Sequence, residues 1–327
     1  MARRATFRPP RLLQNRHLQT LCAAVPAYTP PRRLAGWPTQ RMRFPIDGGA
    51  LTAVAHLRER PERTVLLVHG IGGAADSKYV VRAAAAFWER GYDVVRLNLR
   101  GAGDSMTEMP SIYHAGLTHD LDVVVRTLAT RPGKLYVVGF SGGGSLALKL
   151  AGEWADAPPE HVAAVAALSA PLDLTVVGPW LDGWGRRPYR FHVMRGLVRM
   201  ARAFDRHWPD HAHFDLESLS RFGSVRHFDS TVVAPMHGFD SVDRYWGEAS
   251  AGPFLAKVRV PAIFVHADDD PMVPGWTVRP WLAKAPACVD VAISERGGHL
   301  GWVSGASERD WVRSWPIERV LEAFDRA

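Results

Sequence analysis

The chain has 327 residues, of which 47% are hydrophobic and 22% are charged, a balance typical of a globular protein with a sizeable core. Its formal charge is +7, yet the first 43 residues hold nine arginines and no acidic residue. The rest of the chain therefore carries a net charge of about −2. Because no nucleic-acid-binding motif accompanies the basic arm, these features argue against a nucleic-acid partner.

The cysteines and the hydropathy pattern bear on the compartment. Two cysteines, Cys22 and Cys288, make neither a disulfide framework nor a metal quartet, and they favour a reducing compartment. The basic arm, residues 1–40, is rich in arginine like a transit peptide, but residues 14–17 interrupt any apolar core of a secretory signal. The best apolar run elsewhere, Val162–Leu172, is far shorter than the ~20 residues of a membrane span. We expect a soluble cytoplasmic protein, and no motif calls for a cofactor or specifies an oligomeric state.

In chain order, short apolar runs alternate with amphipathic segments. The runs "RMRFPI" and "LTAVAHLR" flank "DGGA" and predict a hairpin. Six further runs are rich in apolar residues and alternate with helix-like segments, which indicates a mostly parallel, eight-stranded sheet with helices on both faces. These six runs are "TVLLVHG", "DVVRLNLRG", "KLYVVGFS", "VAAVAALSAP", "VPAIFVHADDD" and "CVDVAISERGG". The expected helices are Ser77–Arg90, "THDLDVVVRTLAT" with Thr118 as its N-cap, "GGSLALKLAGEW" and a C-terminal helix from about Glu308.

The alternation stops between residues 172 and 252, where Trp, Phe, His and Arg are frequent. Since a structureless loop of that length is rare, we predict a helical lid inserted into a core of residues 41–171 and 253–327. The clearest lid helix runs from about Tyr189 to Asp205. Its apolar stripe is flanked by a stripe of arginines: Arg195, Arg199, Arg202 and Arg206. The helix either caps a site with its arginines in water or lies on an anionic membrane with them among the headgroups; we favour the first.

The stretch "VVGFSGGGSLALKL" predicts a strand, a glycine-rich corner and a helix. Such a corner can cradle a phosphate at a helix N-terminus, or it can be a G-x-S-x-G nucleophile elbow that exposes a serine hydroxyl. Phosphate binding would require a Gly-Lys-Ser/Thr motif, or a place in the first βαβ unit with an acidic residue ~20 positions further on. The chain meets neither requirement, so we predict that Ser141 is a nucleophile.

An elbow serine predicts an acid and then a histidine after later strands. Asp270 follows a late strand in "ADDDPMVP", and His299 follows the last strand in "GGHLGW". A serine hydroxyl becomes nucleophilic when a base takes its proton; His299 would be that base, and Asp270 would fix its tautomer and stabilise its cation. An earlier strand ends in "HGIGG", so the backbone N–H groups of Ile71 and Gly142 would hold the oxyanion.

Other residues compete for these roles. Asp269 is the main alternative acid because it lies in the same loop as Asp270, and Asp173, after an earlier strand, is a minor one. His266 lies inside a predicted strand and is expected in the core, whereas His69 is expected to fix a loop. Three further histidines are interpreted as part of a solvated loop and not as a metal site: His207, His211 and His213.

With these residues the chain resembles the YheT-like branch of the α/β-hydrolases, the fourth AB-hydrolase family, over nearly its whole length. The matching stretches are "NRHLQT", "HGIGG", "NLRGAGDS", "YHAGLTHDL", "GFSGGGSLALKL", "FDSTVVAPMHGFDSVDRYW", "DDDP" and "GGHLGW". The first, fourth and sixth are not general hydrolase features, so the resemblance is specific. It implies an α/β-hydrolase fold with Ser141, Asp270 and His299 at the triad positions. Gly142 and Ser145 depart from the family pattern, which has a large apolar residue and an Asn there, and this departure changes the wall of the acyl pocket.

The resemblance implies a serine hydrolase of carboxylic esters, with relatives that act on short acyl esters, acylglycerols or phospholipids. We therefore predict a carboxylesterase that works through an acyl-enzyme, with a small acyl ester or a lipid as its substrate. The nearest alternative is a lipase, phospholipase or thioesterase that contacts a membrane peripherally through the basic arm and the lid. The alternative from another class is a binding protein that keeps the triad without turnover.

Overall fold

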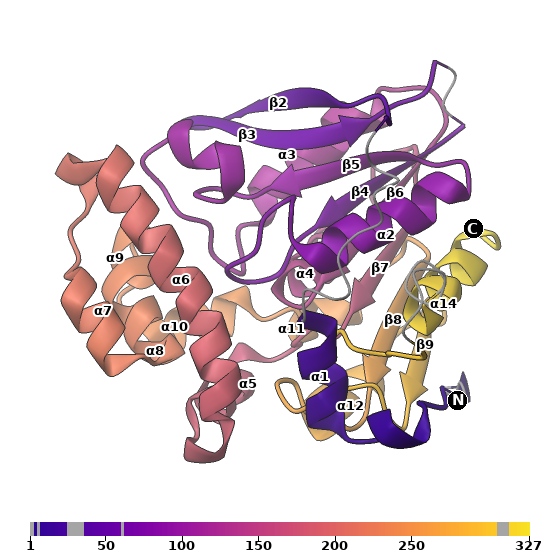
Figure 1. The fold of residues 1–327 in the computed structure, drawn as a ribbon. Coiled ribbons are helices and arrows are strands. Elements are labelled where there is room, and N and C mark those ends of the chain that lie inside the picture. The colour runs from indigo at the N-terminus through magenta and orange to yellow at the C-terminus, as the bar shows by residue number, and fades with distance from the viewer. Residues whose placement is uncertain (1–2, 5–6, 25–35, 60–61, 306–313) are drawn as a thin grey trace.

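The computed structural model describes residues 3–4, 7–24, 36–59, 62–305 and 314–327. One sheet runs through the molecule, with strands in the order β1-β9-β8-β7-β6-β4-β5-β3-β2 (Figure 1). The strands are β1 (Arg3–Arg4), β2 (Gln40–Ile46), β3 (Gly49–His56), β4 (Arg63–Val68), β5 (Asp93–Asn98), β6 (Lys134–Phe140), β7 (Val162–Leu168), β8 (Ala262–Ala267) and β9 (Val289–Ser294). The eight longer strands are the eight that were predicted, and the two-residue β1 joins them at the edge beside β9.

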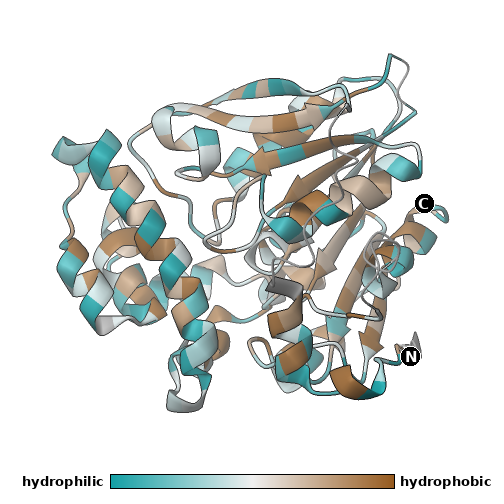
Figure 2. Ribbon diagram, viewed as in Figure 1, coloured by the Kyte–Doolittle hydropathy of each residue, from teal (hydrophilic) through white to brown (hydrophobic). Residues whose placement is uncertain are grey.

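The sheet is parallel except at the hairpin. β2 and β3 pair antiparallel as predicted, β3 is also antiparallel to β5, and the other pairs are parallel. The apolar strands are buried on both faces because successive side chains point to opposite sides. In β4, Leu66 and Val68 enter one hydrophobic core, whereas Val65 and Leu67 enter the other. Figure 2 shows these central strands as apolar along most of their length.

Helices cover both faces, as predicted. They are α1 (Arg16–Ala24), α2 (Lys78–Glu89), α3 (Thr118–Ala129), α4 (Gly142–Trp154), α5 (Leu174–Asp182), α6 (Arg187–His207), α7 (Leu216–Phe222), α8 (Val225–Phe228), α9 (Ala234–Met236), α10 (Val242–Ala249), α11 (Gly252–Leu255), α12 (Gly275–Leu282) and α14 (Trp315–Phe324). Buried residues of α3 and α4 pack in the core on one face, and those of α2 and α14 pack in the core on the other.

The end of α2 follows from a local signal, whereas the starts of α3 and α14 differ from those expected. α2 ends in a Schellman motif: Gly91 has a φ of 86°, and the Tyr92 N–H donates to the carbonyl of Phe87. Thr118 was predicted to cap α3 but is its first residue, because Leu117 takes the capping position without a side-chain hydrogen bond. α14 begins at Trp315, and the start expected near Glu308 lies outside the described residues.

Between β7 and β8 the chain forms the helices α5 to α11, and α6 to α10 gather beside the sheet, on the left in Figure 1. α6 spans 21 residues and includes the predicted helix. It packs directly on the "HGIGG" loop: a Cβ on Gly196 would lie 3.0 Å from the carbonyl oxygen of Gly72. In the part of the chain that the structure describes, no helix is both long enough and apolar enough to cross a membrane.

Candidate active site

Ser141 occupies a sharp corner between β6 and α4. Its φ of 51° and ψ of −122° lie in a region that residues other than glycine rarely adopt. The strand side of the corner is held by the Ser141 N–H, which donates to the Leu168 carbonyl at 2.8 Å. On the helix side, the N–H groups of Gly144 and Ser145 donate to the Ser141 carbonyl. This strained strand-to-helix turn is the geometry of a nucleophile elbow.

The glycines around Ser141 are required by close packing. A Cβ on Gly139 would lie 2.2 Å from the carbonyl oxygen of Gly143, and a Cβ on Gly143 would lie 2.4 Å from that of His69. No side chain fits at such distances, because real Cβ contacts are essentially never shorter than about 3 Å. The G-x-S-x-G spacing therefore follows from how tightly the corner packs against the end of β4.

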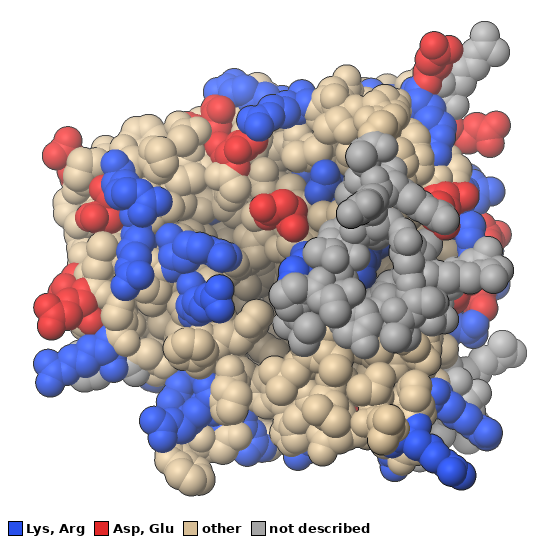
Figure 3. Space-filling model, viewed as in Figure 1, with Lys and Arg blue, Asp and Glu red and all other residues tan. Residues whose placement is uncertain are grey.

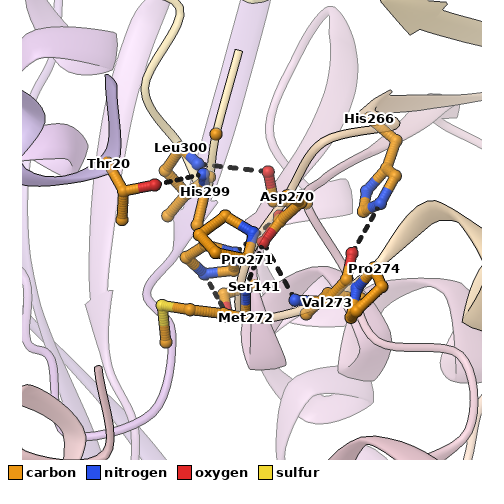
Figure 4. Close-up of polar contacts among 12 residues, drawn as sticks. Thr20, Ser141, His266, Asp270, Pro271, Met272, Val273, Pro274, His299 and Leu300 are labelled. Atoms are coloured by element: carbon orange, nitrogen blue, oxygen red, sulfur yellow. Dashed lines mark hydrogen bonds and ion pairs between the residues drawn. The ribbon is translucent and has the colours of Figure 1, made fainter. Parts of the chain in front are cut away.

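The structure brings the three predicted residues together (Figure 4). His299 Nε2 lies 3.1 Å from Ser141 Oγ, and His299 Nδ1 lies 2.8 Å from Asp270 Oδ2. Since the Nδ1–H can donate only to the carboxylate, Nε2 is left to accept the Ser141 hydroxyl proton. Asp270 and His299 are 1% and 8% exposed, so water competes little for these hydrogen bonds.

The loop after β8 orients the Asp270 carboxylate. Its Oδ1 accepts hydrogen bonds from the backbone N–H groups of Met272 and Val273 at 2.8 and 2.9 Å, which leaves Oδ2 for His299. His266, fully buried in β8 as expected, donates from Nε2 to the Val273 carbonyl at 2.9 Å and supports the same loop.

The alternative acids have other partners. Asp269 Oδ1 accepts a hydrogen bond from the Gly298 N–H at 2.9 Å, and burial raises the pKa of this carboxyl. Asp173 caps α5 and accepts from the Thr175 N–H at 3.0 Å. Among the described residues, only Asp270 places a carboxylate within hydrogen-bonding distance of the His299 ring.

The "HGIGG" loop carries the first predicted oxyanion donor. The Gly70 N–H donates to the Tyr79 hydroxyl at 2.8 Å and the Gly72 N–H to the Tyr113 hydroxyl at 2.6 Å. The N–H of Ile71, between them, donates to no protein group in the described residues, and the same holds for Gly142. The two positions adjoin, since a Cβ on Gly142 would lie 3.5 Å from Ile71 N.

His69 fixes this loop. Its Nδ1–H donates to the Gly70 carbonyl at 2.8 Å, and its Nε2 accepts from the Leu99 N–H at 3.2 Å. Burial lowers the pKa of His69 to about 4, so the ring stays neutral and keeps both hydrogen bonds at neutral pH.

Helix α1 holds the histidine loop, a contact that sequence reasoning missed. Thr20 Oγ1 accepts the His299 N–H at 2.9 Å (Figure 4). The Gln19 amide, fully buried, donates to the Val303 carbonyl at 3.1 Å and accepts the Val303 N–H at 2.6 Å. His17 Nδ1 is hydrogen-bonded to the Tyr189 hydroxyl of α6. The one hint of this contact in the sequence was the family-specific stretch "NRHLQT", but the sequence alone does not reveal what that stretch contacts.

Because α1 holds the backbone on both sides of His299, Gln19→Leu and Thr20→Val are each expected to lower kcat about tenfold to a hundredfold, with KM within about threefold of wild type. The measurement is steady-state hydrolysis of a soluble p-nitrophenyl ester, with thermal unfolding alongside. Cys22→Ala, on the same helix, is the control and is expected to keep wild-type kcat. An unchanged kcat in both variants would mean that α1 does not position His299.

A mostly apolar pocket opens at Ser141 and His299. Helices α5 and α6 contribute several of its apolar walls, and the corner at Ser141 and the "HGIGG" loop line it through Gly142 and Ile71. At Gly142, where the family pattern has a large side chain, a Cβ would meet its neighbours only at ordinary van der Waals distance. The apolar lining from α5 and α6 includes Val177, Leu181, Val193, Leu197 and Met200.

A carboxyl group, Asp229, also lines this pocket, and burial raises its pKa from 3.8 to about 7. Between these values the folded state binds more protons than the unfolded state, so the free energy of unfolding falls as pH rises from about 4 to about 7. In Asp229→Asn this contribution is absent. We expect the stability of the variant relative to wild type to increase across that window, as measured by urea unfolding at several pH values; a difference independent of pH would contradict the assignment.

The three histidines around the end of α6 lie at the surface. His207, His211 and His213 are all exposed. No group of three or more His, Cys, Asp or Glu residues within the described ranges could hold a metal ion.

Comparisons with known proteins identify the family and the fold. A family model described as alpha/beta hydrolase fold matches residues 63–305. "Putative esterase YheT" of Escherichia coli (strain K12) is 29% identical over 312 residues, which cover 92% of this chain and 88% of that protein. "Monoacylglycerol lipase" of Saccharomyces cerevisiae is 30% identical over 269 residues, or 80% of this chain and 59% of the lipase.

Among solved structures, the Pyrococcus furiosus esterase Pf2001 superposes with a TM-score of 0.60 at 14% identity, covering 91% of this chain and 98% of that one, and it shows a likeness of fold. The resemblance to YheT inferred from the motifs is confirmed. With a match over residues 63–305 and the strand order of the sheet, the chain belongs to the α/β-hydrolase family.

Proposed function

We propose that the protein is a serine hydrolase that cleaves carboxylic esters through an acyl-enzyme. The observation that supports this function is the hydrogen-bonded series Ser141–His299–Asp270, with distances of 3.1 and 2.8 Å, at the opening of an apolar pocket. A serine alone is a poor nucleophile, and an imidazole held by a carboxylate is the arrangement that activates it.

In the first half of the reaction, His299 Nε2 takes the proton from Ser141 Oγ as the oxygen attacks the ester carbonyl. Asp270 stabilises the imidazolium that forms, and the N–H groups of Ile71 and Gly142 bind the developing oxyanion. His299 then gives its proton to the departing alkoxide, which leaves as an alcohol, and the acyl group stays on Ser141.

In the second half, water replaces the alcohol. The oxygen of the water attacks the acyl carbon while His299 Nε2 takes a proton from that water. The N–H groups of Ile71 and Gly142 again hold the oxyanion. The proton returns to Ser141 Oγ, and the carboxylic acid leaves. The apolar pocket supports an ester with an apolar acyl chain as the substrate class.

The test is a series of p-nitrophenyl esters from C2 to C16, with kcat/KM measured for each chain length. The proposal predicts multiple turnovers and a maximum at an intermediate length, because the lid and the elbow enclose the pocket. Stoichiometric labelling of Ser141 by a fluorophosphonate without turnover of any ester would instead support the non-catalytic binding protein.

A second candidate, a lipase or phospholipase at a membrane surface, is favoured by the surface where α1 meets the start of α6. Trp184 and Phe191 are 83% and 70% exposed, and Leu18 and Leu21 of α1 are also exposed. Figure 3 shows basic side chains gathered over α6 on the left of the view. Four exposed arginines of α6 fit this position: Arg195, Arg199, Arg202 and Arg206.

Vesicles separate the two candidates. A membrane enzyme would sediment with anionic phosphatidylserine vesicles at low salt and be released at high salt. The carboxylesterase with a lid predicts no retention, so that ester turnover in solution is unaffected by the vesicles. If the wild-type protein is retained by the vesicles, replacing the four α6 arginines by glutamine should abolish the retention and so identify α6 as the membrane-contacting surface.

A further inference from the structure

Two polar side chains on the wall of the acyl pocket lack a protein partner for one of their atoms. They are Asp229, in the stretch "FDSTVVAPMHGFDSVDRYW", and His114, in the stretch "YHAGLTHDL". These stretches lie more than 100 residues apart in the chain and both reach the pocket that contains Ser141 and His299. The proposed mechanism uses neither side chain.

Asp229 is held rigidly with one oxygen engaged. The residue is 5% exposed, and its Oδ2 accepts the Trp246 indole N–H at 2.7 Å. The indole is itself fixed, since a Cβ on Gly178 would lie 2.6 Å from its ring. Asp229 also begins a short π-helix, Asp229–Val233, a local irregularity that is frequent at functional sites. Its Oδ1 has no hydrogen-bond partner among the described residues.

His114 offers a complementary donor. Its Nδ1 accepts the Gly116 N–H at 3.1 Å, so the ring proton lies on Nε2. Burial lowers the pKa of His114 to about 3, which keeps the ring neutral. The Nε2–H has no hydrogen-bond partner in the described part of the chain.

Tyr245 connects the two. Its ring centroid lies 5.6 Å from that of His114, and its hydroxyl accepts the Ala115 N–H at 3.0 Å. The next residue of α10, Trp246, is the one whose indole N–H holds Asp229 Oδ2. Above pH 7, where the Asp229 carboxyl is ionised, the pocket wall thus offers an acceptor, Asp229 Oδ1, and a donor, His114 Nε2–H, on either side of the start of α10.

A hydroxyl group is the ligand that satisfies both atoms, because it donates one hydrogen bond and accepts another. An ammonium group has donors only and would leave His114 Nε2–H unpaired, and a methyl group would leave both unpaired. Buried polar groups without a partner destabilise a complex, so a site built to bind a hydroxyl rejects the analogue that lacks it.

We propose that Asp229 and His114 form a subsite for a hydroxyl group on the acyl chain, so that the protein prefers esters of hydroxylated acids to plain ones. This inference rests on the proposed function, since it assigns the substrate class of the same pocket. The hydroxyl forms hydrogen bonds to Asp229 Oδ1 and from His114 Nε2–H, and no covalent step involves the subsite.

The test measures binding separately from turnover. In the Ser141→Ala background, the dissociation constants of methyl octanoate and of its 6-, 7- and 8-hydroxy derivatives are measured by calorimetry at a pH well above 7, where Asp229 is ionised. We expect at least one hydroxy ester to bind about tenfold or more tightly than methyl octanoate. Adding Asp229→Leu is expected to bring that ratio to about one, and adding His114→Leu is expected to lower it. Ser220→Ala, an exposed change outside the pocket, is the control and should keep the ratio.

Several results would overturn the subsite. They are equal binding of all four esters, a preference that survives Asp229→Leu, or tighter binding of methyl 8-aminooctanoate than of every hydroxy ester. Thermal unfolding checks each variant, and Asp229→Asn, which keeps the shape of the side chain, replaces Asp229→Leu if the latter does not fold; its ratio should fall at least threefold. If wild type turns over no ester while Ser141→Ala still prefers a hydroxy ester, the proposed function fails and the subsite stands.

Discussion

Ser141→Ala is expected to lower kcat for ester hydrolysis by about 10⁶-fold, the loss seen when a triad nucleophile is removed. The alanine leaves no oxygen for His299 to activate, and the corner itself is unaffected because a methyl group fits where the hydroxymethyl was. KM is expected to change little, since the pocket walls stay in place. The measurement is steady-state hydrolysis of the best p-nitrophenyl ester from the chain-length series.

The matched control is Ser220→Ala, an exposed serine of α7 outside the pocket, which should keep wild-type kcat. Circular dichroism and thermal unfolding establish that both variants fold. A Ser141→Ala protein that retains more than about a hundredth of wild-type kcat would contradict the assigned nucleophile.

Asp270→Asn is expected to lower kcat by about 10⁴-fold. An amide in place of the carboxylate no longer compensates the imidazolium, and its N–H₂ group can turn toward His299 Nδ1 and favour the wrong tautomer. Asp269→Asn is the matched comparison, one residue away in the same turn. Its amide oxygen can still accept the Gly298 N–H, so kcat is expected to stay within about tenfold of wild type.

To decide which carboxylate is the acid, kcat of Asp270→Asn and of Asp269→Asn is measured on the same ester at the same pH, and unfolding curves show that both variants fold. If Asp269→Asn lost the larger part of kcat and Asp270→Asn the smaller, the assignment of the acid would be wrong.

The sheet was predictable because its signals are local. After their first one or two residues β4 and β6 are apolar, as expected of strands buried on both faces. The corner at Ser141 is marked by the glycines on both sides of the serine, which its close packing requires. Cap positions are less certain by nature: Thr118 has a side chain suited to capping, but the backbone turns one residue earlier, at Leu117.

The site was predictable in part. Each of the three residues follows the C-terminal end of a strand: Ser141 follows β6, Asp270 follows β8 and His299 follows β9. Because the C-terminal ends of parallel strands lie at one edge of the sheet, their convergence could be expected. The sequence predicted Asp270 as the acid but kept Asp269 as the main alternative. Which of the two faces His299 depends on which carboxylate the N–H groups of Met272 and Val273 orient, and that is a property of the folded loop.

The contact of α1 with the histidine loop was beyond sequence reasoning. Gln19 and Val303 are 284 positions apart, and no hydropathy period or turn signal relates them. Gln19 is a polar residue in a basic arm, which predicts exposure, yet it is fully buried because the Val303 backbone satisfies its amide.

The central claim is that His299 makes the Ser141 hydroxyl nucleophilic. Intact-mass analysis after treatment with a fluorophosphonate, followed by peptide mapping, tests it most directly. The account predicts one adduct per chain on Ser141 in the wild-type protein, a rate of labelling that falls steeply in His299→Ala, and no adduct in Ser141→Ala. An unmodified wild-type protein, or an equal adduct on Ser141→Ala, would contradict it.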